Sequence, residues 1–258
     1  MLTKVKVLEG YKLNSLDGEL GKVKDFYFDD THWTVRYLVA DTGNWLTGRK
    51  VLLSPYALTA VNKEKEYISV DLSKKQIENS PSLESDQPVS KQFEESYYGY
   101  YDWPMYTNGQ ATWGALAFIE RNREKNKAKN SGGKPWDPDL RSTDAVTGYN
   151  IEATDGEIGH VEDFVIDDES WTIRYLVIDT RNWLPGGKKV LISPLWIDRV
   201  SWDQSKVFVN LTRKAIENSP EYSEVSLVTR DYENKLCAHY KKQGYWNDAP
   251  DSSSRFVD

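Results

Sequence analysis

DGELGKVKDFYFDDTHWTVRYLVAD, residues 17–41, is the stretch that decides the fold, because the chain repeats it as DGEIGHVEDFVIDDESWTIRYLVID at residues 155–179. At a constant offset of 138, 22 of 37 positions are identical between residues 10–46 and residues 148–184. A repeat of this length indicates two like domains rather than the short units of a solenoid. The fold predicted for one copy is therefore expected for the other copy as well.

Each copy reads as strands and turns. Residues 22–29 fit the two-residue period of a strand, and residues 33–40 are rich in aromatic and β-branched side chains, which together predict a hairpin. Asp17-Gly18 predicts an earlier tight turn, and Gly21, matched by Gly159, predicts a bulge or a sharp bend. Further strands are expected at residues 5–8, 50–53 and 67–72, with counterparts at 189–192 and 206–211, so that each copy has five or six short strands.

Helices are expected only after the strands of each copy. Ser73 and Gln76 have the spacing of a capping box, whereas the second copy keeps Thr212 but has Ala215 at the fourth place. Both helices are predicted to stop before a proline, and a second, longer helix with an aromatic tail follows in each half. We expect domains at residues 1–118 and 143–258, joined by a flexible linker at 119–142. Its basic run, residues 121–129, reads more simply as a solvated segment than as a phosphate or membrane contact.

Composition narrows the class of protein. The chain of 258 residues has a formal net charge of −7 and an aromatic share of 13%, which suits small β cores and argues against broad nucleic-acid binding. The single cysteine cannot form an intramolecular disulfide. No apolar stretch has the length of a signal peptide or a spanning helix, so a cytoplasmic location is expected, with peripheral membrane contact left open. The predicted fold class is mainly β: two small barrels in tandem, each followed by short α-helices.

The search for catalytic and metal-binding motifs predicts no enzyme and no cofactor. Phosphate-binding loops, zinc-protease motifs, nucleophile elbows and paired cysteines do not occur. The three histidines do not fall at matching positions of the repeats, which argues against a repeated histidine metal site. A repeated acidic set could hold a hard cation, but turn formation and pairing with arginine explain it more simply; the set comprises Asp25, Asp29 and Asp30, with Asp163, Asp167 and Asp168.

Several repeated residues are expected to be structural. Arg36 and Arg174 lie between apolar neighbours in the best strand of each copy, so a partly buried guanidinium needs carboxylate or carbonyl partners. Asp25 and Asp41, with Asp163 and Asp179, are the expected partners. The full structural set is Gly18, Gly21, Arg36, Asp41, Gly156, Gly159, Arg174 and Asp179.

The loop Asp-Thr-x-Asn-Trp-Leu is the candidate partner-binding element. It places Asn44 and Trp45 in the first copy and Asn182 and Trp183 in the second. Each tryptophan is either a lid on the end of its barrel or a docking anchor, and both interpretations stay open. As docking anchors, the two loops would allow bivalent capture of a symmetric or repeated partner.

The repeated DG-E-x-G-x-V-x-D-F, followed by W-T-x-R-Y-L-V-x-D-T, resembles the PRC-barrel family over residues 10–72 and 148–211. That family includes the cytoplasmic barrel of the photosynthetic reaction centre H subunit and the C-terminal domain of the bacterial ribosome maturation factor, and this chain resembles a stand-alone bacterial branch. The resemblance implies a non-catalytic protein-interaction or assembly module with a protein partner. The alternatives are a reaction-centre-H-like accessory role in photosynthetic electron transfer or peripheral membrane assembly, and a metal-dependent enzyme that uses the Asp cluster.

Duplication also predicts the arrangement of the two halves. A fused pair can reuse the contact that a homodimer would make, so we expect the barrels to be related by an approximate internal two-fold axis. The aromatic tails motivate a further expectation, self-association of the whole chain into a homodimer.

Overall fold

The structure is a computed structural model, and it describes residues 1–46, 50–81, 89, 91–103, 140–181, 183, 186–223 and 227–248. The basic run at 121–129 and most of the expected linker lie outside these residues. The last three residues of that linker, Leu140–Ser142, form a strand, β8.

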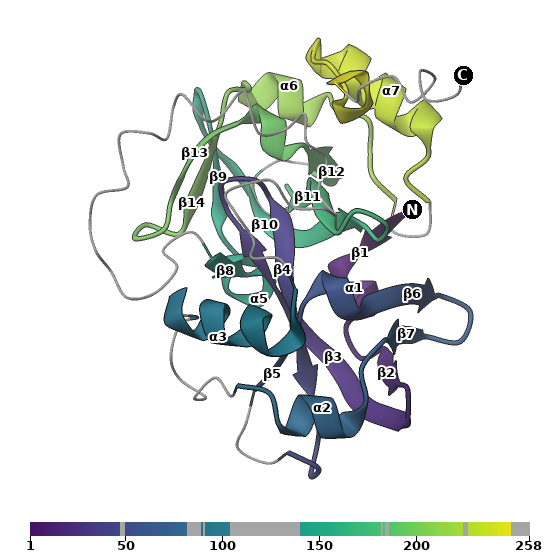
Figure 1. The fold of residues 1–258 in the computed structure, drawn as a ribbon. Coiled ribbons are helices and arrows are strands. Elements are labelled where there is room, and N and C mark those ends of the chain that lie inside the picture. Colours follow the sequence, from purple (N-terminus) through teal and green to yellow (C-terminus); the bar gives the residue numbers. More distant parts are fainter. Residues whose placement is uncertain are drawn as a thin grey trace, which may run out of the picture.

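The first repeat is built from short strands followed by two helices (Figure 1). Its elements are β1 (Leu2–Lys4), α1 (Val5–Leu8), β2 (Lys12–Ser15), β3 (Gly18–Asp29), β4 (Thr34–Asp41), β5 (Val51–Leu53), the 3-10 turn η1 (Pro55–Ala57), β6 (Leu58–Asn62), β7 (Tyr67–Val70), α2 (Lys74–Glu78) and α3 (Lys91–Tyr101).

The second repeat follows the same order. Its elements are β8, α5 (Thr143–Val146), β9 (Asn150–Ala153), β10 (Gly156–Asp167), β11 (Thr172–Asp179), β12 (Lys189–Ile192), η3 (Pro194–Trp196), β13 (Ile197–Ser201), β14 (Lys206–Val209), α6 (Arg213–Glu217), α7 (Arg230–Tyr240) and η4 (Tyr245–Asp248).

One 14-stranded sheet runs through both repeats. Its main path is β13-β14-β9-β10-β11-β4-β3-β2-β7-β6, with β12 paired to β11 and β5 paired to β4. Each repeat therefore contributes a curled half, and among the strands that the structure describes no pairing joins β5 to β6 or β12 to β13. The predicted fold class, mainly β with two barrels followed by short helices, is confirmed.

The long strand β3 bends where glycine was expected. Gly21 has a φ of +145°, and a Cβ at this position would lie 2.0 Å from the carbonyl oxygen of Asp41. The partner strand shifts register between Leu13 and Asn14 opposite this bend. Only a residue without a Cβ lets β3 cross β4 this closely while it also pairs with β2.

The expected strand at residues 5–8 is wrong. Val5–Leu8 is the short helix α1, and the strand lies just before it at Leu2–Lys4. Val5 and Leu8 are buried while the two residues between them are exposed, and this spacing of three is helical rather than extended. The apolar residues that suggested a strand are the buried face of a single helical turn.

The two repeats meet through equivalent backbone bonds. The amide of Val35 donates to the carbonyl of Trp171 over 2.8 Å, and the amide of Ile173 donates to the carbonyl of Trp33 over 2.7 Å. Both tryptophans have positive φ, 55° for Trp33 and 51° for Trp171, a conformation that is rare for a bulky residue. Because each bond has its counterpart at the offset of 138, the expected internal two-fold relation is confirmed.

Each repeat also lends a strand to the other. β1, from the start of the first repeat, pairs with β10, and β8, from the start of the second repeat, pairs with β3. The registers are equivalent, since Leu2 faces Asp167 and Leu140 faces Asp29. The N-terminal strands are therefore exchanged between the barrels.

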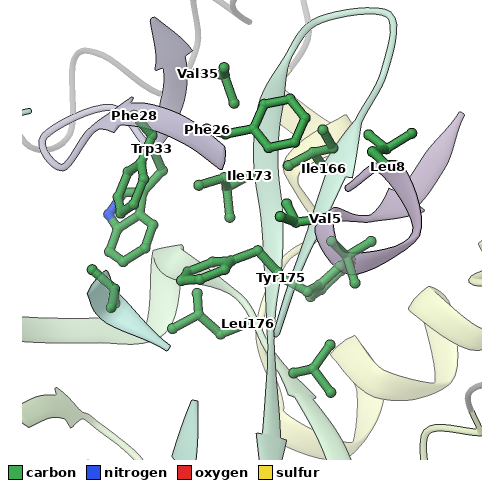
Figure 2. Close-up of a cluster of buried hydrophobic side chains, with 14 of the residues drawn as sticks. Val5, Leu8, Phe26, Phe28, Trp33, Val35, Ile166, Ile173, Tyr175 and Leu176 are labelled. Carbon is green, nitrogen blue, oxygen red and sulfur yellow. The ribbon is translucent and has the colours of Figure 1, made fainter. Parts of the chain in front are cut away.

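Apolar side chains fill the region between the repeats. Figure 2 shows Phe26, Phe28 and Trp33 of the first repeat close to Ile166, Ile173 and Leu176 of the second. The rings of Phe28 and Phe164 lie 5.8 Å apart between centroids. The largest hydrophobic cluster takes buried residues from both repeats, so the barrels share one core.

A second, smaller core lies outside the first barrel, beneath α3. Tyr97 and Tyr98 of this helix pack on Tyr37, Val39 and Leu52 of strands β4 and β5. The Tyr97 hydroxyl donates to the carbonyl of Leu52 over 2.9 Å. Both faces of β4 are therefore covered, which explains why the strand is buried almost throughout.

Candidate protein-interaction surfaces

The first tryptophan loop begins at the end of β4. The carboxylate of Asp41 accepts a hydrogen bond from the amide of Gly43 at 2.9 Å, which starts the turn. Trp45 is partly buried against the main core, and the ammonium of Lys74 lies 5.7 Å from the centroid of its ring. Asn44 is exposed at the tip. The loop thus presents a tryptophan that is neither free nor fully covered.

The second loop repeats this design with different neighbours. Asp179 accepts a hydrogen bond from the amide of Arg181 at 2.9 Å and pairs with its guanidinium at 2.5 Å. The hydrogen bonds from Arg181 lower the pKa of the Asp179 carboxyl to about 2. Trp183 is partly buried, and its ring lies 5.5 Å from that of His160. Asn182 lies outside the described residues.

The two loops point away from each other. β4 and β11 pair in antiparallel fashion at their first residues, where Thr34 faces Thr172, and each strand then runs outward to its loop. At about 3.3 Å per residue, the seven steps along each strand separate the loops by up to roughly 45 Å. Figure 1 shows the same divergence, since α2 and α6, the helices that follow the two barrels, lie at opposite ends of the molecule.

Arg36 is buried, as expected, but its partner is not one of the four aspartates predicted from the sequence. It forms a buried ion pair with Glu94 of α3, and the hydroxyl of Tyr37 donates to the same carboxylate at 2.9 Å. The sequence could not reveal this pairing because Glu94 lies 58 residues after Arg36, on a helix outside the barrel. The arginine ties the outer helix to the strand.

In the second copy, the equivalent arginine and glutamate bind different groups. Arg174 lies 3.3 Å from the Asp167 carboxylate, and its guanidinium stacks 4.0 Å from the centre of the Tyr245 ring. Glu233, the equivalent of Glu94, accepts from the Tyr175 hydroxyl at 2.9 Å. Burial raises the pKa of the Glu233 carboxyl. The expected partners Asp163 and Asp179 bind other groups.

Asp25 and Asp163 hold helices instead of arginines. Asp25 accepts hydrogen bonds from the hydroxyls of Ser142 and Thr143 and from the amide of Asp144, at 2.6, 2.9 and 3.2 Å. Asp163 accepts from the amide of Lys6 at 3.2 Å. Each aspartate therefore binds the start of the short helix contributed by the other repeat.

Two further residues of the acidic set, Asp29 and Asp30, also bind protein groups. Asp29 accepts from the amides of Thr31 and His32, and Asp30 pairs with Arg141 at 3.1 Å. In the part of the chain that the structure describes, histidine, cysteine and acidic side chains form no group of three or more that could hold a metal ion. The geometry assigns this set to turns and to contacts between the repeats.

The glycines of the DG turns sit at the foot of the short helices. Gly18 and Gly156 have φ values of +134° and +126°. The preceding Asp17 accepts from the amide of Lys74, the first residue of α2, at 2.8 Å. The DG turn thereby fixes the helix that the capping box of Ser73 begins.

The structure has a cleft at the end of α3 that the sequence analysis does not predict. Its volume is about 380 Å³, and it lies between η1, the end of β7, α2 and the aromatic tail of α3. Its lining residues are Tyr56, Asp71, Leu72, Gln76, Tyr100, Tyr101 and Trp103. The sequence indicates this cleft only indirectly, because several of these lining positions carry different residues in the second repeat.

The comparisons with known proteins agree with this architecture. No curated protein matches the chain. Within the described residues, no helix combines the length and the apolarity needed to cross a bilayer. The PRC-barrel domain profile matches residues 9–77 and 144–216, which together make more than half of the chain. These segments coincide with the two curled halves of the sheet, and the protein therefore belongs to the PRC-barrel family, with two copies of the domain.

Proposed function

We propose that this protein is a non-catalytic assembly module that bridges two protein partners through its tryptophan loops. Membership of the PRC-barrel family supports a protein-interaction role. The observation that carries the bridging role is the antiparallel meeting of β4 and β11 at Thr34 and Thr172, which directs the two loops to opposite ends. The single cysteine, which is buried and free, supports the cytoplasm as the proposed compartment.

Each loop has the features of a docking anchor. Trp45 and Trp183 are partly buried, so each ring is held in place before a partner arrives. Aromatic residues held in this way supply much of the binding energy at protein interfaces. The exposed Asn44 beside Trp45 adds a hydrogen-bonding group at the tip of the first loop.

The geometry favours bridging over bivalent capture. Two anchors that face away from each other cannot engage one compact partner at the same time, because an avidity gain requires both sites to be reached simultaneously. The separation of up to roughly 45 Å suits two partner molecules, one at each end, or one long partner that wraps around the sheet.

The test combines capture with stoichiometry. The tagged full-length protein is used to isolate its partner, and the mass of the complex is then measured for the wild type, Trp45→Ala, Trp183→Ala and the double variant. We expect two partner molecules on the wild type, one on each single variant and none on the double variant, with the thermal transition of each single variant lowered by no more than about 12 °C.

Leu16→Ala is the matched control, because Leu16 is a large apolar residue, 68% exposed, outside both loops. It should leave stoichiometry unchanged. Capture that survives in the double variant would refute the docking role. Loss of capture together with a collapse of the thermal transition would assign the tryptophans to lids.

A further inference from the structure

The cleft at the end of α3 contains a stack of three aromatic rings. Trp103 lies with its ring centroid 4.5 Å from that of Tyr101 and 5.7 Å from that of Tyr56, at interplanar angles of 16° and 28°. Tyr100 meets Tyr101 edge-on at 4.8 Å, and its hydroxyl donates to the carbonyl of Gln76 at 3.0 Å. The aromatic wall is therefore fixed by contacts on several sides.

A carboxylate lies beside this wall. Asp71 is exposed in the cleft, and its backbone amide is bonded to the carbonyl of Ala57 at 2.8 Å. Among the described residues its carboxylate accepts no hydrogen bond and forms no ion pair, and the cleft lining contains no lysine, arginine or histidine. The cleft thus combines aromatic rings, of which Tyr100 is the most exposed, with one carboxylate that has no described partner.

The second repeat has lost this combination at the equivalent positions. Asn210 replaces Asp71, Leu195 replaces Tyr56 and Lys242 replaces Trp103. The ring that packs against Tyr240, the equivalent of Tyr101, comes instead from the buried Trp196, at 4.9 Å. Trp196 stands where the first repeat has Ala57. In the second repeat a tryptophan of the protein itself therefore packs on the equivalent tyrosine, and a lysine stands at the sequence position of Trp103.

We propose that the cleft of the first repeat binds an organic ammonium group, either a small quaternary amine or the side chain of a lysine on a partner. Ammonium groups are attracted both to the faces of tyrosine and tryptophan rings and to a nearby carboxylate. The volume of about 380 Å³ leaves room for such a group. The site is separate from the tryptophan loops, and the formal net charge of −7 favours the approach of a cation.

The first experiment uses a matched pair of probes at constant ionic strength. Choline and its neutral isostere 3,3-dimethylbutan-1-ol are titrated into the full-length protein, and binding is followed by the NMR shifts of the Trp103 indole. We expect saturable binding of choline and none of the isostere. Equal binding of both probes, or no binding of either choline or the lysine probe below, would overturn the proposal.

A second pair of probes separates the two sources of the cation. Capped lysine, N-acetyl-lysine methylamide, is compared with the same compound acetylated on its side chain. Tighter binding of choline than of capped lysine assigns the site to a free quaternary amine, whereas tighter binding of capped lysine assigns it to a partner's side chain. Binding of the side-chain-acetylated compound as tight as that of capped lysine would overturn the recognition of charge.

The variants install residues that the second repeat already carries. Asp71→Asn should weaken binding at least about threefold and Tyr56→Leu about tenfold, because they remove the charge and one ring of the stack. Glu64→Gln is the control, since it removes one exposed carboxylate outside the cleft. Choline affinity that is unchanged in Asp71→Asn and Tyr56→Leu, with melting temperatures intact, would place the binding elsewhere and refute the proposal.

Discussion

Asp25 accepts a hydrogen bond from the hydroxyl of Thr143 at 2.9 Å, although the two residues stand 118 positions apart and belong to different repeats. Together with Ser142 and the amide of Asp144, this contact gives Asp25 three hydrogen bonds across the two-fold relation. Asp163, at the equivalent position, accepts one such bond from the described residues, from the amide of Lys6. The two halves are thus alike in fold but unequal in how strongly each holds the other.

This inequality predicts different costs of removing the two carboxylates. Asp25→Ala should lower the free energy of unfolding by about 2–4 kcal/mol, because it leaves a buried hydroxyl and an amide without their acceptor. Asp163→Ala should cost about half as much. Since 1 kcal/mol shifts the melting temperature of a chain of this size by about 2–4 °C, calorimetry resolves the difference. Equal shifts would show that the bonds between the repeats contribute little.

The buried ion pair between Arg36 and Glu94 gives a second prediction. Arg36→Met should destabilise the protein by about 3–5 kcal/mol, because it removes the positive charge that pairs with the buried carboxylate of Glu94. Adding Glu94→Leu to that variant should recover most of the loss. Arg174→Met is the comparison, and its effect should be smaller because Asp167 also accepts from Ser170. Chemical denaturation measures all of these variants, and a double variant no more stable than Arg36→Met would contradict the pairing.

The pKa of Asp179, about 2, predicts that this carboxyl contributes to the pH dependence of stability. A carboxyl whose pKa is lowered by folding stabilises the protein above its unfolded value near 3.8, and this contribution is lost as the pH falls toward 2. Arg181→Gly installs the residue of the first repeat, Gly43, and should return the pKa of Asp179 toward its ordinary value. Carboxyl NMR titration follows Asp179 directly. A titration midpoint unmoved by the substitution would remove Arg181 as the cause.

The two loop tryptophans should differ in their contribution to stability. Trp45 packs against the main core, whereas the contact described for Trp183 is with the ring of His160 near the surface. We therefore expect Trp45→Ala to cost about 1–3 kcal/mol and Trp183→Ala less than about 1 kcal/mol, both below the usual 3–5 kcal/mol for a fully buried aromatic. Thermal unfolding measures both values. A loss of 3 kcal/mol or more in each variant would favour lids over anchors.

The bend in β3 gives the most severe prediction. Gly21→Ala should cost at least about 4 kcal/mol, because the new Cβ would collide with the carbonyl of Asp41 at 2.0 Å and φ is +145°. Gly10→Ala is the matched control, since Gly10 also has a positive φ, +81°, but open space around it. That variant should cost about 1–2 kcal/mol from backbone strain alone. Similar melting temperatures for the two variants would mean that the crossing of β3 and β4 can relax.

Much of each barrel could be predicted from the sequence, because its signals are local. The Asp17-Gly18 turn, the hairpin arms and the capping box of Ser73 are all set by residues near one another, and the structure contains each of them. The two-fold relation could be predicted because duplication itself implies a reusable contact. The helix at Val5–Leu8 was missed because one helical turn and a short strand have similar apolar content, and only burial separates them.

The partners of the buried charges could not be predicted in the same way. Asp25 and Asp41 are the partners that the motif predicts for Arg36, yet it pairs with Glu94, a residue on a helix whose docking depends on the tertiary fold. The sequence predicts Asp25 as a turn residue, a metal ligand or a partner of Arg36, yet it binds the start of α5. The aromatic cleft was missed for a related reason: Tyr56, Asp71 and Trp103 come from three separate elements, and their meeting is visible only once those elements are placed.

The exchange of β1 and β8 has a consequence for how the protein is made. As the nascent chain leaves the ribosome, the edge of β3 that receives Leu140–Ser142 stays open until about 110 further residues have been translated, roughly 6–20 s at ordinary rates of synthesis. β1 stays unpaired for longer still, because its partner residues in β10 begin at Val165 and are translated later. An uncovered strand edge invites pairing with another polypeptide. Co-translational folding of the first barrel therefore ends with an unfinished edge, which only the second half of the same chain, or the corresponding segment of a neighbouring one, can complete.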